Sequence, residues 1–339
     1  MSSADPTLLT LVWGGIILFA VYAYVVMDGF DLGLGLLFLA YPERADRDVL
    51  MNSVAPVWDG NETWLVLGGG GLFAAFPLAY AILMPALYAP IIAMLLGLVF
   101  RGVAFEYRWR TNRGRWVWDA AFIGGSFVAT FAQGIVLGAI VQGVKVDGRE
   151  YAGGWFDWLT PFSLLTGVAV VVGYLLLGCT WLVMKTDGAI QERARKLGWV
   201  FGLATVASIG AVSLATPFVN SDYWDRWFVF PNALFSFVVP TIIVFIAVLM
   251  FRSLKVHHHE YRPFVLTLVL FALCFVGLAI SLFPNIVPPS VSMQAAAAPP
   301  SSQIFMLVGV AITMPLIIGY TAYAYWIFRG KIDPEHGYH

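Results

Sequence analysis

Charge is scarce in this sequence of 339 residues, of which only 12% are Asp, Glu, Lys or Arg. A soluble domain is about 25% charged and roughly half apolar, whereas 60% of these residues are hydrophobic and the mean hydropathy is +0.81. This shortage of charge excludes a soluble enzyme. The apolar runs are continuous for about twenty residues, unlike the alternating segments of about ten residues in a membrane β-barrel. The composition predicts an all-α integral membrane protein.

Cysteine and excess positive charge are also lacking. Cys179 and Cys274 both lie in apolar runs, so no disulfide framework or Cys-x-x-Cys redox site is available, and each is expected to be a small buried hydrophobe. The net charge of −1 argues against a nucleic-acid partner, because neutralising phosphates requires a basic surface. The first residues lack Lys and Arg, so we expect the first apolar run to be a retained span and not a cleaved signal.

Histidine is missing from every apolar run. The five histidines are His257, His258 and His259, between two such runs, and His336 and His339 in the C-terminal tail. Spans without histidine lack the usual axial ligand of a b-type haem, so the chain is predicted to ligate no haem and no metal centre. Two interpretations stay open for residues 257–259, a surface metal site and a basic patch at the lipid headgroups.

Nine apolar runs are long enough to cross a bilayer as helices. The predicted spans are 8–40, 53–76, 79–101, 118–142, 161–184, 199–219, 230–251, 263–284 and 304–328. The first is too long for a bilayer core of roughly 30 Å, so it is expected to tilt, kink or project, with a break at DGFDLGLG. The nine spans fit a single membrane domain, 1–339, of two four-helix bundles, about 8–142 and 161–284, and a peripheral helix, about 304–328.

The basic residues indicate the orientation. All of the 19 except Lys145, Arg149 and Arg226 fall in the loops after odd-numbered spans or in the C-terminal tail. By the positive-inside rule the N-terminus lies outside and the C-terminus in the cytoplasm.

Glycines recur within the spans. Gly29 and Gly33 are four residues apart, and Gly68 to Gly71 form a run. Small residues let helices approach closely in a membrane, so we expect these glycines to serve packing.

Away from the span ends, four carboxylates lie within the predicted spans, as the pairs Asp28 and Asp31, and Asp59 and Glu62. An ionisable residue in a span costs about 2.5–3.5 kcal/mol and is therefore a candidate functional residue. A spacing of three places each pair on one face of its helix, and a short loop makes the two spans antiparallel neighbours whose acids can face one another. At about 1.5 Å per residue, Asp59 is expected about 10 Å from the cytoplasmic end of its span.

Two interpretations compete for these acids. They could cap a broken helix at Gly29 and Gly60, or pair with a buried cation such as Arg101. Alternatively they could relay protons or cations, because carboxylates packed together away from water can hold a shared proton. We favour the relay, since four acids with one nearby base exceed what capping requires. Trp58 and Trp64 flank the second pair, where they could hold the relay, contact another subunit or simply pack.

Four segments carry a family resemblance. They are DGFDLGLGLL (28–37), NSVAPVWDGNETWLV (52–66), the following GGGGLFAAFPLAYA, and RGVAFEYR (101–108). In this order they resemble subunit II of the cytochrome bd-type quinol oxidases. The motifs cover about the first 110 residues, and length, span count and topology extend the resemblance over the rest.

The resemblance implies a complex in the bacterial cytoplasmic (inner) membrane. It implies a heterodimer with a subunit I of similar fold, which carries the haem groups, haem b and haem d or only b-type haems, and the quinol-oxidising loop. The complex oxidises quinol and reduces oxygen to water with cytoplasmic protons, and generates a proton gradient without pumping. A structural quinone, membrane lipids and small single-span subunits are further implied partners, with no motif to locate them.

The resemblance also implies a proton path. The acid of the family's WDGN motif falls on Asp59, which we expect to be the main relay acid, and those of its DGFD motif fall on Asp28 and Asp31. Glu62 stands where some members have Gln, and we expect it to support the path. Residues expected to support the path or contact the partner subunit are Trp58, Asn61, Trp64 and Arg101.

Two other functions stay open. One is a proton-coupled transporter whose broken first helix lines a site at the membrane midplane. The other is a scaffold subunit that only stabilises a haem-bearing partner and uses its acids for packing.

Overall fold

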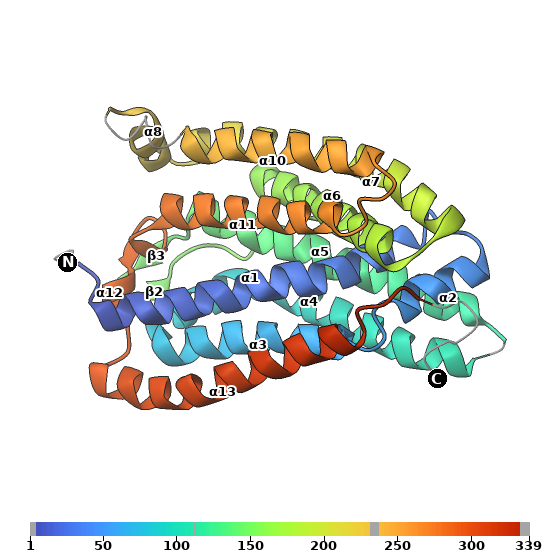
Figure 1. Ribbon diagram of the computed structural model, residues 1–339. Helices are drawn as coiled ribbons and strands as arrows, with labels where there is room; N and C mark the ends of the chain where they lie inside the picture. Colours follow the sequence, from blue (N-terminus) through green and yellow to red (C-terminus); the bar gives the residue numbers. More distant parts are fainter. Residues whose placement is uncertain (1–4, 112, 231–236, 333–339) are drawn as a thin grey trace.

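The computed structural model describes residues 5–111, 113–230 and 237–332. His336 and His339 lie outside these ranges. The described chain is a bundle of long helices that run side by side, with the N-terminus at one end of the bundle and the C-terminus at the other (Figure 1).

The order of elements is almost purely helical. The helices are α1 (Leu8–Leu37), α2 (Arg44–Asn52), α3 (Trp58–Ala75), α4 (Pro77–Arg110), α5 (Arg115–Gln142), α6 (Pro161–Lys185), α7 (Gly188–Val219), α8 (Ser221–Phe228), α10 (Val238–Lys255), α11 (Arg262–Leu282), α12 (Met293–Ala296) and α13 (Pro300–Ile327). The strands are β1 (Val146–Asp147), β2 (Glu150–Tyr151), β3 (Asn285–Val287) and β4 (Val291–Ser292), which form the antiparallel pairs β1–β2 and β3–β4.

Every predicted span overlaps a long helix. Among the described residues, eight helices are long and apolar enough to cross a membrane, namely α1, α4, α5, α6, α7, α10, α11 and α13. Helix α3 is not one of them. Its 18 residues include the acids Asp59 and Glu62 and the polar residues Asn61 and Thr63, which lower its hydropathy. The prediction of an all-α integral membrane protein is confirmed.

Helix ends differ from the predicted spans. Helix α4 continues to Arg110, beyond the predicted end at 101, and α7 begins at Gly188, before the predicted start at 199. Arg, Lys and Glu are good helix formers, so these helices extend past the apolar residues that mark the membrane. The short helices α2 and α8, which are rich in charge, were not predicted.

The expected break in the first helix is wrong. Helix α1 runs without interruption from Leu8 to Leu37, through all of DGFDLGLG. Its glycines instead allow close packing, because a Cβ added at Gly33 would lie 2.0 Å from the Tyr174 carbonyl oxygen on α6. Gly68 and Gly71 likewise face α1, which confirms the packing role for these positions.

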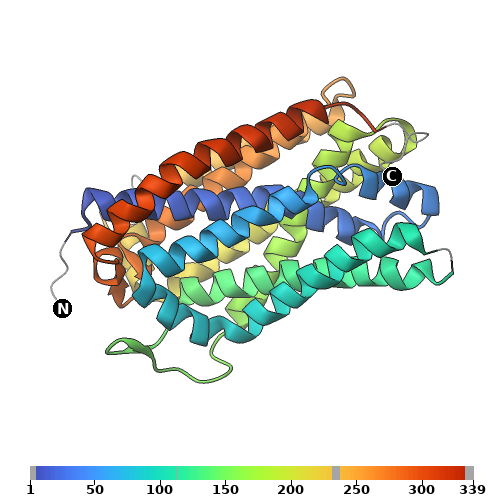
Figure 2. The ribbon, with the colours of Figure 1, turned by 90° about the horizontal axis from the view of Figure 1, so that it is seen from below.

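Helix α1 is central in the bundle. It packs against α3, α5 and α6, while α4 packs on α5, α7 on α6 and α10 on α11. Helix α13 crosses the outside of α1 and α3, as Figure 2 shows from below. Cys179 is buried in this core, as predicted, and Cys274 is half-buried.

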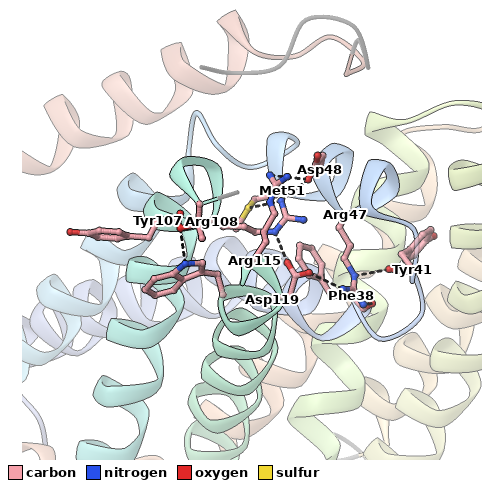
Figure 3. Close-up of polar contacts among 11 residues, drawn as sticks. Phe38, Tyr41, Arg47, Asp48, Met51, Tyr107, Arg108, Arg115 and Asp119 are labelled. Atoms are coloured by element: carbon pink, nitrogen blue, oxygen red, sulfur yellow. Dashed lines mark hydrogen bonds and ion pairs between the residues drawn. The ribbon is translucent and has the colours of Figure 1, made fainter. Parts of the chain in front are cut away.

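A buried network of charges fixes α2 against the ends of α4 and α5 (Figure 3). The fully buried Arg108 contacts Asp48 of α2 at 2.6 Å and Asp119 of α5 at 2.5 Å. Arg47 donates to the second oxygen of Asp119 at 2.9 Å and to the carbonyl oxygen of Tyr41 at 2.8 Å. The network therefore joins three helices at the end of the molecule where α1 finishes.

Candidate functional site

The acids of α1 meet a buried arginine of α4. Asp28 is 0% exposed and accepts a hydrogen bond of 2.7 Å from Arg101, which is itself 2% exposed. The other terminal nitrogen of Arg101 donates to Glu62 of α3. The guanidinium thus bridges a carboxylate of α1 and a carboxylate of α3. The pairing with Arg101, the less favoured of the two interpretations of these acids, is present for Asp28 and Glu62.

Asp31 lies one turn further along α1 and is 1% exposed. Its Oδ2 accepts a hydrogen bond of 2.8 Å from the side-chain amide of Asn61, which also donates to the Met27 carbonyl oxygen at 3.3 Å. Its Oδ1 is buried without a hydrogen-bond partner among the described residues. Asp31 is therefore held by a neutral amide and not by a cation.

A tyrosine from the far end of the sequence completes this contact. The Tyr325 hydroxyl of α13 donates to Asn61 Oδ1 at 2.8 Å. Asn61 is thus fixed from both sides, by α1 and by α13. Tyr325 was not predicted as a site residue, because nothing in its apolar surroundings distinguishes it from the neighbouring aromatic residues.

The two tryptophans have different surroundings. The Arg101 guanidinium lies over the Trp58 ring at 5.7 Å, and Trp58 stacks on Phe105 at 5.0 Å. Trp58 therefore helps to enclose the arginine. Trp64 is buried with Ala20, Ala23 and Tyr24 of α1, so its position fits the packing interpretation.

Asp59 lies apart from the other three acids. Its side chain is exposed and makes no hydrogen bond or ion pair with any residue that the structure describes. The expected depth of about 10 Å is wrong, because α3 begins at Trp58 and Asp59 falls in its first turn. Helical residues 59, 63, 66, 70 and 73 form one exposed face of α3. An acid in the first turn also complements the positive end of the helix dipole.

A second polar chain leads away from the acids toward the middle of the bundle. The Gln133 amide donates to the Tyr24 hydroxyl at 2.8 Å, and the Tyr174 hydroxyl donates to Gln133 Oε1 at 2.7 Å. Tyr24 lies one turn before Asp28 on α1. Gln133 and Tyr174 were missed because they come from α5 and α6, which meet α1 only in the folded chain.

Charge balance decides what this site can do. Asp28, Asp31 and Glu62 share one arginine, so the fully ionised cluster would carry two uncompensated negative charges. Burying an uncompensated carboxylate is costly, whereas a carboxyl group that holds a proton is tolerated. No group of His, Cys, Asp or Glu in the described part of the chain is arranged to hold a metal ion. The cluster is suited to holding and sharing protons.

The sequence also matches a known family over nearly its whole length. The family model described as cytochrome bd terminal oxidase subunit II covers residues 9–328. The chain belongs to this family.

Individual relatives agree. The chain is 30% identical over 369 aligned positions to "Cytochrome bd-I ubiquinol oxidase subunit 2" of Escherichia coli strain K12, covering 98% of this chain and 97% of that protein. It is 29% identical over 323 positions to "Cytochrome bd ubiquinol oxidase subunit 2" of Bacillus subtilis, covering 91% and 93%. The bd oxidase of Geobacillus thermodenitrificans shares the fold, with a TM-score of 0.79 at 18% identity over 95% of this chain and 99% of that one.

Membership of the bd oxidase subunit II family has direct consequences. The chain is a subunit of a quinol oxidase complex, which is an oxidoreductase, and a multi-pass protein of the bacterial inner membrane. A subunit II implies a partner subunit I, and a cytochrome complex implies haem groups.

Proposed function

We propose that this chain is the haem-free subunit of the oxidase and provides part of a proton path from the cytoplasm for the reduction of oxygen to water. The observation that carries the proposal is Asp31, a buried carboxyl group held by Asn61 next to an ion-paired cluster. A carboxyl in such a position can take up a proton and pass it on, because its charged form is poorly stabilised. Asp28 and Glu62 are the neighbouring carboxylates of the path, and Arg101, which keeps its own proton, holds them in place by its ion pairs.

The donor set of this chain does not fit a haem. All five histidines lie outside the predicted spans, so the usual axial ligand is missing where a membrane haem would sit. We therefore assign haem b and haem d, or only b-type haems, to subunit I, together with quinol oxidation. A structural quinone and small single-span subunits stay predictions from the resemblance.

We propose further that α3 is a ninth span. It lies beside α1, and the packing of the other helices is compatible with bundles of α1, α3, α4 and α5 and of α6, α7, α10 and α11, with α13 peripheral. The basic ends of the helices would face the cytoplasm. A reporter fused to the C-terminus tests this orientation, and periplasmic activity of the reporter would reject it.

In this proposal Asp59 acts at the contact with subunit I. It lies in the first turn of α3, on the exposed face that also presents the apolar side chains of Val66 and Phe73. We infer that subunit I covers this face and that Asp59 passes protons across the contact.

The test uses isosteric variants of the assembled complex. Asp31→Asn and Asp59→Asn are expected to lower oxygen consumption about tenfold or more, since a positioned proton-transfer group contributes at least that much. Trp58→Phe is the local control. Asp119→Asn controls for the loss of a carboxylate outside the path, because Arg108 keeps Asp48 as a counter-charge in that variant. Both controls are expected to keep most of the turnover.

The haem spectrum separates the remaining outcomes. Normal turnover with full haem content in Asp31→Asn and Asp59→Asn would reject the proton path. Loss of the haems from those variants would support the scaffold function instead. The transporter function has lost its main support, because α1 is continuous where a broken helix was expected.

A further inference from the structure

A hollow of about 480 Å³ opens between α10 and α11 at their basic ends. Arg252 and Arg262 line it from the two helices, and His259 lines it from the connecting loop. Leu249, Val265 and Leu266 form its apolar wall. It therefore combines two guanidinium groups with an apolar surface, and none of its lining residues belongs to the acidic cluster around Arg101.

Neither arginine of the hollow has an acidic partner within the described residues. Arg252 is exposed and forms no ion pair there. Among the described residues, the Arg262 side chain makes one hydrogen bond, from Nη1 to His259 Nε2 at 3.0 Å. Loss of water around the ring and the neighbouring Arg262 and His258 hold the pKa of His259 below its usual range, which favours the neutral ring that accepts this bond. Two positive charges thus remain uncompensated.

The nearby acids are engaged elsewhere. Glu260 contacts Lys331 at 2.5 Å, and Glu192 contacts His257 at 3.0 Å and Lys196 at 3.8 Å. They are therefore not the counter-charges of the hollow.

The loop beside the hollow is fixed by a buried arginine. Arg195 of α7 donates to four backbone carbonyl oxygens, those of Leu254, Val256, His257 and His259, at 2.9–3.3 Å. Since Arg195 is 5% exposed, these four hydrogen bonds lie within the core. They hold the end of α10 and the loop in one conformation, so the hollow is formed in advance of any ligand.

The apolar wall continues into the membrane-facing surface. Val244, Phe245 and Val248 of α10 and Val269 of α11 are exposed along the same two helices. A molecule with an anionic head and a hydrocarbon tail could therefore place its head at the hollow and its tail along the helices.

We propose that this hollow is a binding site for an anionic phospholipid, with the phosphate between Arg252 and Arg262 and an acyl chain on Leu249, Val265 and Leu266. The planar fork of Arg matches phosphate oxygens in pairs, and basic pockets between membrane helices on the cytoplasmic side suit anionic headgroups. Of the two interpretations of residues 257–259, this proposal takes up the basic patch at the lipid headgroups.

Lipid binding to the delipidated whole complex tests the proposal. Native mass spectrometry would follow titration with phosphatidylglycerol, and with phosphatidylcholine as the neutral lipid. Arg252→Gln with Arg262→Gln is expected to weaken phosphatidylglycerol binding about 25-fold, at about fivefold per arginine near an anionic headgroup. Arg110→Gln with Arg113→Gln removes the same charge from exposed positions away from the hollow and is expected to change binding less than twofold.

A second variant leaves the charge unchanged. Val265→Trp places a large side chain at a position that is 51% exposed, so it fills the hollow without overpacking the core, and it is expected to reduce binding at least tenfold. An equal loss of phosphatidylglycerol binding in the two double-arginine variants would overturn the proposal, because it would indicate general electrostatic attraction to the surface. Equal affinity for the two lipids, or displacement of phosphatidylglycerol by inorganic phosphate, would also overturn it. None of these measurements depends on the proton path.

Discussion

Replacing Arg101 by Gln should destabilise the complex through the carboxylates that the arginine leaves behind. Asp28 and Arg101 are both nearly inaccessible to water, and their contact is 2.7 Å. Removing one partner of a buried ion pair costs about 3–5 kcal/mol, because the other charge stays buried and unpaired. The Glu62 side chain is 28% exposed, so its contact adds less, about 1 kcal/mol or below.

The same reasoning predicts that neutralising the acids restores stability. In Arg101→Gln combined with Asp28→Asn and Glu62→Gln, all three members of the ion-paired group are neutral, Asp31 keeps the Asn61 contact that it has in the native chain, and amides can replace the lost hydrogen bonds. This triple variant should come within about 1 kcal/mol of the native complex, since a buried pair and its neutral replacement are often equally stable. Its oxygen consumption should stay low, because Asp31 remains but Asp28 and Glu62, its proposed partners in proton exchange, are gone.

Thermal unfolding of the purified complex, followed with the haem spectrum, ranks the native, single and triple forms. If the Arg101→Gln complex is as stable as the native complex, the reasoning is refuted, since the carboxylates would then need no arginine. A triple variant no more stable than the single one would also refute it, by showing that the loss comes from the packing of Arg101 over Trp58. Native turnover in a stable triple variant would reject a proton role for these acids.

Two further predictions concern packing and positioning. Gly33→Ala should lower thermal stability by about 1–3 kcal/mol or more, because its Cβ would lie 2.0 Å from the Tyr174 carbonyl oxygen, whereas Gly69→Ala, with nothing within 4 Å, should not. Tyr325→Phe removes the donor to Asn61 and should lower turnover severalfold and change its pH profile while leaving the haem content unchanged. A pH profile identical to that of the native complex would show that the hydroxyl only anchors α13.

The membrane architecture could be predicted because it depends on local composition. A helix in lipid must satisfy its own backbone, so each long apolar run is a helix whatever its neighbours are. The same approach missed the helix ends, since α4 continues to Arg110 through charged residues, where hydropathy carries no signal. It also failed at DGFDLGLG, where glycine suggested a break but the contact with α6 keeps α1 helical.

The acids could be found from sequence, but their environments could not. Asp28 and Asp31 have the same spacing as Asp59 and Glu62, yet the first pair is buried, and in the second pair only Glu62 reaches the arginine. Which residue of a helix faces a neighbour depends on rotation about the helix axis, which the long-range packing sets. Tyr325 illustrates the same limit, because it meets Asn61 across 264 residues of sequence.

Two clusters of buried charge in this chain show why burial alone does not indicate a function. Around Asp119, the arginines Arg47, Arg108 and Arg115 contact the carboxylates of Asp48 and Asp119, so each carboxylate there has a counter-charge and the contacts join three helices. Around Arg101 the acids outnumber the bases by three to one. The first arrangement is complete without a mobile proton, whereas the second is electrically complete only when protons are bound. The excess of carboxylates, and not their depth in the membrane, is therefore what points to proton transfer.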